Sequence, residues 1–565
     1  MGAIIVSKLH VQHQRASSSS RTTQRSNHSS NNNQAGTSQF PSAFSAAPAL
    51  LMDRVQLEDS NLVLSLISLL FVASFFVIVR SFWSSRIDGS RVLPPSPSGL
   101  PIIGNLHQLV KGHHHRTLHA LALRHGPLFL LHLGSVPTVV VSSPSMAVTV
   151  LKTQDHVFCG RPQQHTARGM LWDCRNVGFS PYGERWRQLR RIAVVHLLSA
   201  KRVDSFRSLR EEEVAALIRR IRTASAQDSM RRGVNMTELL VGLTNTVVSR
   251  AAFGNKLGGM EPRMVHQMFK EVTDLLQSIA VSDVFPRLGW VDRMTGLDAR
   301  IKRIASKLDD VLESALREHE ESRLDGDEAG DLLDDVLLVL KEGSSGFKLD
   351  RTDVKGLIFD MFIAGTDTTA KLMEWTMAEL IKNPKEMEKA QAEVRQVVGA
   401  QGTVLEEQLS TMNLLHAAMK EALRLHPPAP LLIPHEVVQD TKLHGYDILA
   451  KTRVLINAWA IGRDSDSWEN ADEFQPERFL HNAFDYSGKD FRFIPFGAGR
   501  RGCPGIAFGT RLVELALANM LYHFDWELPN GQDRESFEVV ESSGFSPGLK
   551  CALNLVAKPL QTMRQ

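Results

Sequence analysis

A short loop rich in glycine and arginine surrounds one of the chain's four cysteines and is the stretch best suited to chemistry. The loop covers residues 496–505 and reads FGAGRRGCPG. Glycine tolerates positive φ, so the backbone can fold tightly and turn its amide groups toward the sulfur. A proline just after the cysteine suits the first position of a helix, which the pattern of residues 505–517 predicts. Because a helix N-terminus with Arg500 and Arg501 nearby favours an anionic sulfur, we expect Cys503 to be a thiolate.

The second candidate is a cluster of small and hydroxyl residues in the middle of a long predicted helix. The pattern predicts this helix over residues 353–382, with Thr352 as its N-cap and Asn383-Pro384 at its end. Its middle, AGTDTT at positions 364–369, weakens a helix, because glycine is flexible and threonine hydroxyls compete for backbone carbonyls. A helix bent only for packing would have the same signature, so this segment gains chemical meaning only beside a reactive group.

Glu421 and Arg424 are three residues apart on a predicted helix, so their charges lie side by side. An exposed pair of this kind contributes little stability. The flanking residues are apolar, however, which indicates a partly buried pair that needs a third partner. Arg478, in the segment PERF at 476–479, is the candidate, and we assign these three charges to the fold rather than to bond-making.

These motifs resemble those of the cytochrome P450 haem-thiolate monooxygenases. The loop at 496–505 fits the family pattern Phe-x-x-Gly-x-Arg-x-Cys-x-Gly, in which the cysteine binds the haem iron. The segment at 364–369 matches Ala-Gly-x-Asp-Thr, and the charged triad resembles the family's Glu-x-x-Arg with Pro-x-Arg. The resemblance runs from about residue 93 to the C-terminus, with five motifs in the family's order. It implies haem b as cofactor, Cys503 as the metal ligand, and Asp367 and Thr368 as a proton relay beside the O₂ site.

The resemblance also implies which residues hold the haem. Its two propionates need hydrogen-bond donors, and the planar guanidinium of arginine suits them best. Arg501 lies two residues before the cysteine, and Phe496 opens the same loop. Trp186 and Arg190 match the family's Trp-x-x-x-Arg and share one face of a predicted helix. His435 stands where relatives carry Arg or His for this purpose. Without the resemblance, His435 would be read as an ordinary structural histidine. The helix that carries Trp186 and Arg190 would be read as an ordinary basic helix.

Composition describes a globular chain and excludes several other classes. Hydrophobic residues make up 43% of the sequence and charged residues 22%, enough for a substantial core. A net charge of +3, without a basic helix or zinc-ligand spacing, gives no reason to expect a nucleic-acid partner. Four cysteines without paired spacing argue against a disulfide framework and favour a reducing compartment.

Helical periodicity dominates the main body of the chain, as in residues 302–312, where apolar side chains recur at i, i+4 and i+7. Short β-rich runs at 128–133 and 138–142 predict a hairpin in a small sheet. We therefore expect a mainly α fold with a minor β-sheet portion. By resemblance it is the cytochrome P450 fold, a single large catalytic domain behind an N-terminal transmembrane anchor.

The sequence predicts four segments. Residues 1–60 form a disordered Ser/Asn-rich tail, 61–79 a transmembrane signal anchor, 80–105 a basic and Pro-rich hinge, and 106–565 the haem-thiolate monooxygenase domain. The anchor is uncharged and about as long as one bilayer pass, although a buried core helix would look similar. Arginines after it place the catalytic domain in the cytosol, and we expect a single-pass protein of the endoplasmic reticulum membrane, in contact with membrane lipid. The acid-free residues 1–52 fit a transit peptide, a flexible tail or an over-long translation start.

The resemblance implies insertion of one oxygen atom of O₂ into a small hydrophobic plant metabolite. No Gly-x-Gly-x-x-Gly follows a predicted strand, so electrons must come from a separate protein, by resemblance the NADPH–cytochrome reductase. Arg492, Arg500 and Lys489 are a predicted docking surface for its acidic face. Two alternatives are a haem-thiolate isomerase or dehydratase that needs no O₂, and a non-catalytic haem-binding sensor or tethered interaction protein. The intact Asp367-Thr368 pair argues against both, because neither needs a proton relay.

The expected substrate pocket, again by resemblance, draws on five separate segments. They are residues 163–176, 278–288, 359–364, 429–433 and 544–547. Several carry large apolar side chains, so a small hydrophobic substrate is expected. Terpenoid, indole-derived and phenylpropanoid compounds all fit this description.

Overall fold

The computed structural model describes residues 65–74, 91–110, 112–228, 230–254, 262–324, 330–342, 349–482 and 484–560. The chain divides into two compact units, Met1–Ser90 and Arg91–Gln565. In the first unit, residues 65–74 are helical and exposed. The remainder of the predicted tail and anchor, and the predicted hinge up to residue 90, lie outside the described residues. Within the described part of the chain, no helix combines the length and apolarity needed to cross a membrane.

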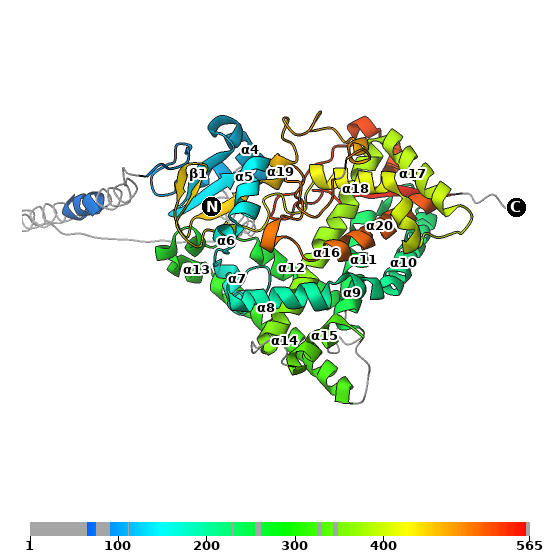
Figure 1. Ribbon diagram of the computed structural model, residues 1–565, viewed down its shortest axis with the longest axis horizontal. Coiled ribbons are helices and arrows are strands. Elements are labelled where there is room, and N and C mark those ends of the chain that lie inside the picture. The colour runs from blue at the N-terminus through cyan, green and yellow to red at the C-terminus, as the bar shows by residue number, and fades with distance from the viewer. Residues whose placement is uncertain are drawn as a thin grey trace, which may run out of the picture. The chain divides into compact units, whose positions relative to one another are not determined.

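The second unit is mainly helical. Its α-helices are α3 (Leu106–Leu109), α4 (His114–His125), α5 (Pro144–Val148), α6 (Asp155–Phe158), α7 (His165–Met170), α8 (Glu184–Ile192), α9 (Ala200–Ser205), α10 (Arg207–Gln227), α11 (Met236–Phe253), α12 (Pro262–Leu276), α13 (Trp290–Met294), α14 (Leu297–Leu324), α15 (Leu332–Glu342), α16 (Arg351–Lys382), α17 (Pro384–Val398), α18 (Asn413–Leu425), α19 (Ala458–Ile461) and α20 (Ile506–His523). Short 3₁₀ segments include η6 (Pro476–Phe479) and η7 (Gly499–Arg501). In Figure 1, β1 lies beside α4 and α5 on one side of this unit, with α10, α17 and α18 on the other.

Among the described residues, the β-structure is small and divided among three sheets. Its strands are β1 (Leu128–Leu133), β2 (Val136–Val141), β3 (Val234–Asn235), β4 (His435–Glu436), β5 (Thr441–Leu443), β6 (Tyr446–Ile448), β7 (Arg453–Ile456), β8 (Phe524–Glu527) and β9 (Asn554–Pro559). The largest sheet has the order β1-β2-β7-β4, and the others are β3-β9-β8 and β5-β6. The predicted hairpin is confirmed: β1 pairs antiparallel with β2, with Leu128 opposite Val141. The expectation of a mainly α fold with minor β content is likewise confirmed.

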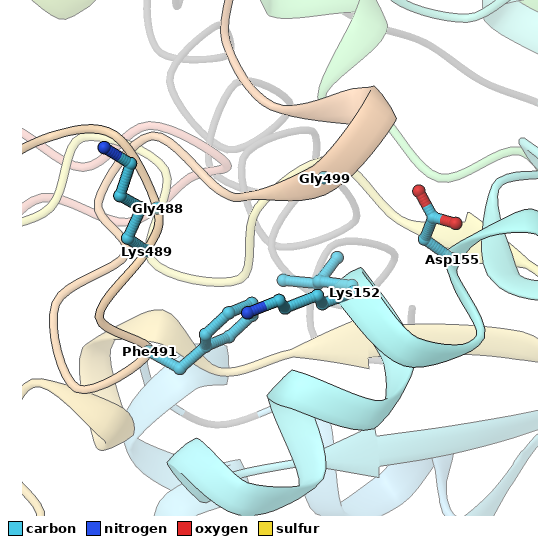
Figure 2. A pocket seen from close by; sticks show the side chains of 7 residues that line it. Lys152, Asp155, Gly488, Lys489, Phe491 and Gly499 are labelled. Atoms are coloured by element: carbon cyan, nitrogen blue, oxygen red, sulfur yellow. The ribbon is translucent and has the colours of Figure 1, made fainter.

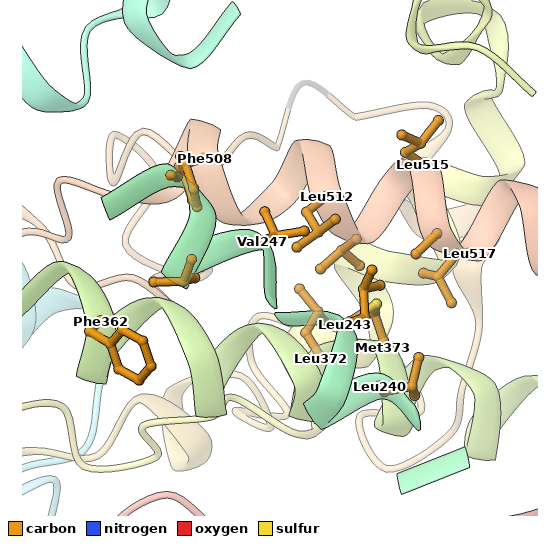
Figure 3. Packing of buried hydrophobic residues seen from close by; sticks show 14 of the residues in the cluster. Leu240, Leu243, Val247, Phe362, Leu372, Met373, Phe508, Leu512, Leu515 and Leu517 are labelled. Atoms are coloured by element: carbon orange, nitrogen blue, oxygen red, sulfur yellow. The ribbon is translucent and has the colours of Figure 1, made fainter. Parts of the chain in front are cut away.

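The long helix α16 runs through the core and is buried over most of its length. Figure 3 shows apolar side chains of α11, α16 and α20 meeting. They include Leu240, Leu243 and Val247 of α11, Phe362, Leu372 and Met373 of α16, and Phe508, Leu512, Leu515 and Leu517 of α20. The spacing of i, i+3 and i+7 on α11 places its three side chains on one face. This packing fixes the middle of α16 in a rigid frame.

The ends of α16 differ slightly from the prediction. Its N-cap is Asp350 rather than Thr352, because the Asp350 carboxylate accepts the backbone N–H groups of both Thr352 and Asp353. Asp353 completes a capping box by accepting the Asp350 N–H. The C-cap is Asn383, so the helix ends at Asn383-Pro384 as the sequence predicts, and Pro384 begins α17.

The predicted triad of charges is confirmed as a structural element. Glu421 and Arg424 of α18 are fully buried and form two hydrogen bonds, of 2.7 and 2.8 Å. Arg478 of η6 donates from Nε to the same carboxylate at 3.0 Å. Arg424 also donates to the carbonyls of Gly462 and Ala471, at 2.7 and 2.6 Å. The triad thus ties α18 to the irregular segment that leads into the Cys503 loop.

Candidate active site

The backbone of the Cys503 loop depends on its glycines. Gly497 and Gly499 adopt positive φ angles of 68° and 66°. A Cβ on Gly499 would lie 2.0 Å from the carbonyl oxygen of Leu151, so only glycine fits there. The Cys503 N–H donates to the Phe496 carbonyl at 2.9 Å and closes the loop. The following helix begins at Ile506, so the predicted first helical position, Pro504, was wrong by two residues.

The surroundings of Cys503 act in opposite directions on the charge of its sulfur. The side chain has accessible surface, yet burial among protein atoms raises the pKa of its thiol. The Gly505 N–H and the positive charge of Arg190 act in the opposite direction. In the protein without a bound group, burial therefore favours the neutral thiol over the thiolate. A metal ion bound at the sulfur removes the proton outright, so the site still fits a metal-ligating cysteine.

The two arginines next to the cysteine face away from the sulfur. Arg500 pairs with Asp155 at 2.8 Å and donates to the Tyr182 hydroxyl at 2.7 Å. Arg501 donates to the backbone carbonyls of Cys159 and Ser180, both at 2.8 Å. These contacts with distant residues could not be read from the sequence. They explain why the two arginines do not stabilise an anionic sulfur.

The middle of α16 is exposed where the rest of the helix is buried. Ala364 is exposed, and Asp367 and Thr368 are partly exposed. The Thr368 hydroxyl donates to the Ala364 carbonyl at 2.5 Å, a contact that tends to bend helices. Gly365 lets α16 pack closely against α11, because a Cβ there would approach Val248 at 3.3 Å. The middle of α16 is therefore accessible although the rest of the helix is buried. A planar group bound beside the helix would need this arrangement.

Positively charged side chains without acidic partners lie near the Cys503 loop. Burial, together with the charge of neighbouring Arg190, lowers the pKa of Arg501 to about 10. Burial also lowers the pKa of Arg190, which makes no ion pair among the described residues. Buried cations are normally paired with anions. Two carboxylates on a bound cofactor, such as the propionates of haem, fit this surplus of positive charge.

Trp186 and His435 occupy positions that limit what each can donate. The Trp186 indole N–H donates to the Val177 carbonyl at 3.1 Å, while its ring lies 4.1 Å from the Arg501 guanidinium. Trp186 therefore packs against Arg501, and in this structure its N–H is used by a backbone carbonyl. His435 Nδ1 lies 2.7 Å from the Phe158 carbonyl, and burial lowers its pKa well below the usual value. Because that Nδ1 must carry the proton, Nε2 can donate to a propionate only in the doubly protonated ring.

A model of the cytochrome P450 family matches residues 94–547. The chain belongs to the cytochrome P450 family. It is 50% identical to cytochrome P450 71A1 of Persea americana, over 87% of this chain and 99% of that protein. It is 43% identical to the phenylacetaldehyde oxime monooxygenase CYP71AN24 of Prunus mume, over 90% of this chain and 97% of that protein. It is 42% identical to strychnine-11-hydroxylase of Strychnos nux-vomica, over 88% and 97%.

A solved structure also matches the fold. A zebra fish cytochrome P450 with progesterone superposes with a TM-score of 0.67 at 28% identity, covering 80% of this chain and 100% of that one. The chain is accordingly a P450 monooxygenase, an oxidoreductase, and haem b is the cofactor of its family. The relatives place this P450 among plant enzymes of specialised metabolism.

Two buried residues that support this P450 site escaped the sequence analysis. Asp360 of α16 accepts hydrogen bonds from Asn176 Nδ2 at 2.7 Å, Val177 N at 2.5 Å and Gly178 N at 3.1 Å. Arg161 donates to the carbonyls of the same loop and of the segment before β4, at Gly178, Ile433 and Pro434. Together they hold the loop whose carbonyls receive Trp186 and Arg501. An acid inside the apolar run LIFDMF was the available signal for Asp360.

Replacing Asp360 by asparagine should change how stability depends on pH. Burial raises the pKa of Asp360 to about 6, above an ordinary unfolded value near 3.8. A carboxyl whose folded pKa is raised stabilises the protein most below its unfolded pKa, and that contribution is lost as pH rises through about 6. Relative to Asp360→Asn, the native protein should therefore lose about 1 kcal/mol between pH 5 and pH 7. Denaturant unfolding of both proteins at the two pH values measures this, and a pH-independent difference would contradict it.

Proposed function

We propose that this P450 inserts one oxygen atom of O₂ into a small hydrophobic plant metabolite, using electrons from NADPH–cytochrome reductase at the endoplasmic reticulum membrane. One observation carries the proposal. A cysteine with accessible surface and the exposed middle of α16 occur together with partly buried arginines that lack acidic partners among the described residues. This set provides for a metal ligand, an O₂ site and anion binding. The relatives named as an oxime monooxygenase and an alkaloid hydroxylase support the reaction class.

In this proposal each site residue has a defined role. Cys503 binds the haem iron with Phe496 in the same loop, and bound haem supplies the activation of O₂. Arg190 and Arg501 bind the propionates, with Trp186 as the support of Arg501. His435 joins them only where the negative charge of a propionate offsets the burial that lowers its pKa. The Asp367 carboxylate and the Thr368 hydroxyl move protons toward the O₂ side of the site. The apolar residues of the expected pocket bind the substrate and exclude water.

The predicted reductase surface needs revision. Arg492 pairs with Asp490 and Arg500 with Asp155, so acids offset two of the three predicted cations. A pocket of about 220 Å³ lies between residues 151–155 and 488–499, and Figure 2 shows Lys152 there beside the ring of Phe491. Lys489 also lines this pocket, and neither lysine makes an ion pair within the described residues. The pocket adjoins Gly499 of the cysteine loop, so these lysines are the better candidates for contacting an acidic partner.

Reversing both charges in Lys152→Glu/Lys489→Glu should slow electron transfer from the reductase by about tenfold. Complementary charges mainly raise association rates, and their effect weakens with salt. Stopped-flow reduction under carbon monoxide, at low and high ionic strength, measures the effect. Lys385→Glu, an exposed lysine of α17, is the matched control and should reduce normally. Unchanged reduction of the double variant at low salt would refute this docking surface.

The proposed reaction is tested by its cofactor requirement. A library of terpenoid, indole-derived and phenylpropanoid compounds is screened for shifts in the haem spectrum, and each hit is incubated with reductase and NADPH. We expect an oxygenated product only when NADPH, reductase and O₂ are all present. An isomerase or dehydratase would form product without NADPH. A sensor would form none, and either result would contradict the proposal.

A further inference from the structure

A lysine on α16 joins the proton-relay acid to the turn that the family resemblance assigns to the substrate pocket. Lys371 Nζ donates to Asp367 Oδ2 at 2.5 Å, one helical turn away. The same ammonium donates to the Ser546 carbonyl and to the Ser546 hydroxyl, the latter at 3.1 Å. Ser546 belongs to the turn at residues 544–547, which is 175 positions further along the chain. One side chain therefore touches both functional elements.

The stem of this turn is fixed to α16 independently of Lys371. The Trp375 indole N–H donates to the Pro547 carbonyl at 3.3 Å, and the Leu549 N–H donates to Glu374 Oε2 at 3.5 Å. On the other side, the Phe545 N–H donates to Gln277 Oε1 at 3.2 Å. These contacts position the turn as a whole. What Lys371 adds is a link between the tip of the turn and the Asp367 carboxylate.

The bonding capacity of the ammonium supports a specific role. An ammonium has three N–H donors, and Asp367 and Ser546 together supply three acceptors. Glu374, the next acid along the helix, accepts instead from the Thr237 hydroxyl and from the Leu549 N–H just after the turn. The Lys371 side chain is mostly buried, at 18% exposure, and its stem lies against Gly548, where a Cβ would be 3.1 Å away. The Lys371 side chain thus has little freedom to move away from Asp367 or from Ser546.

We propose that Lys371 is a positioning residue that makes proton delivery by Asp367 depend on the substrate-lining turn. The inference rests on the proposed function, in which Asp367 relays protons. Productive turnover converts RH, O₂, NADPH and H⁺ into ROH, H₂O and NADP⁺. If protons arrive at the wrong place, the same two electrons instead reduce O₂ and two protons to H₂O₂. Lys371 therefore controls the share of electrons that reaches product, and not the affinity for substrate.

The test compares Lys371→Met, which keeps the length but removes the charge, with Lys371→Arg and with the native protein. Linalool, indole and cinnamyl alcohol serve as terpenoid, indole and phenylpropanoid probes. Product and H₂O₂ are measured per NADPH consumed, together with the spectral Kd of each probe. We expect Lys371→Met to lower the product fraction at least threefold with an unchanged Kd, and Lys371→Arg to restore most of it. Lys382→Met, at the exposed end of the same helix, should behave as the native protein.

Each outcome decides a different claim. If the native protein oxidises none of the probes with NADPH and reductase, the proposed function fails and the role of Lys371 fails with it. If the native protein forms product and Lys371→Met forms as much product per NADPH consumed, only the inference about Lys371 is overturned. The inference about Lys371 is likewise overturned if Lys382→Met also forms less product per NADPH, or if Lys371→Arg does not restore that ratio. A lower haem content in Lys371→Met without rescue by arginine would assign Lys371 to the fold.

Discussion

Replacing Cys503 by serine is expected to lower the rate of monooxygenase turnover about 1,000-fold or more. This loss corresponds to an activation barrier raised by about 4 kcal/mol. Serine nearly keeps the size of the side chain and leaves the glycine-dependent loop intact. In the proposed function, it removes the sulfur that would bind the haem iron and donate the electron density that favours O–O cleavage. The reduced, carbon monoxide-bound protein should then lose its thiolate-type absorption band. The measurement is this spectrum, recorded together with NADPH-dependent product formation.

The control for Cys503 is Cys551→Ser, because Cys551 is also exposed but lies outside the loop. We expect this variant to keep both the thiolate-type spectrum and the activity. A thiolate-type spectrum in Cys503→Ser would show that another residue binds the iron. Loss of the spectrum in Cys551→Ser alone would lead to the same conclusion.

Replacing Arg424 by methionine should destabilise the protein more than any other substitution considered above. The change leaves the Glu421 carboxylate fully buried, with Arg478 as its only remaining charged partner within the described structure. Removing one member of a buried ion pair costs about 3–5 kcal/mol, because the remaining charge stays without full compensation. We expect a lowered unfolding midpoint and reduced haem content, measured by thermal unfolding and by haem quantification.

Two further variants separate this effect from a simple loss of charge. Lys389→Met removes an exposed lysine that pairs with Glu386 and Glu477, and should leave the midpoint nearly unchanged. The double variant Glu421→Gln/Arg424→Met removes the unpaired carboxylate and should recover part of the stability. If Arg424→Met unfolds at the native midpoint, the triad is not the structural element described here.

Features encoded within a short stretch could be predicted from the sequence. The tight loop at 496–505 follows from its glycines, and the bounds of α16 follow from local capping signals to within two residues. Glu421 and Arg424 are neighbours on one helix, so helical geometry alone brings them together. The predicted Glu421–Arg424 pair and the hairpin were confirmed for this reason.

Features that depend on contacts between distant segments could not be predicted. Arg500 is neutralised by Asp155, 345 residues earlier, so proximity in sequence to Cys503 was a misleading guide. The Trp186 N–H was already used by a backbone carbonyl, which a motif of side chains does not reveal. Asp360 and Lys371 contact loops that are far away in the chain. A single sequence does not show which residues of two distant segments lie together. The desolvation that raises the pKa of Cys503 is also a property of the assembled fold.

The most direct test of the central claim, that this P450 transfers one atom of O₂ to its substrate, is isotopic labelling. A compound that shifts the haem spectrum is turned over with NADPH and reductase under ¹⁸O₂ in ordinary water, and in parallel under ordinary O₂ in H₂¹⁸O. Mass spectrometry should find one ¹⁸O atom in the product of the first reaction and none in the product of the second. Label derived from water, or equal product formation without O₂ or NADPH, would contradict the account.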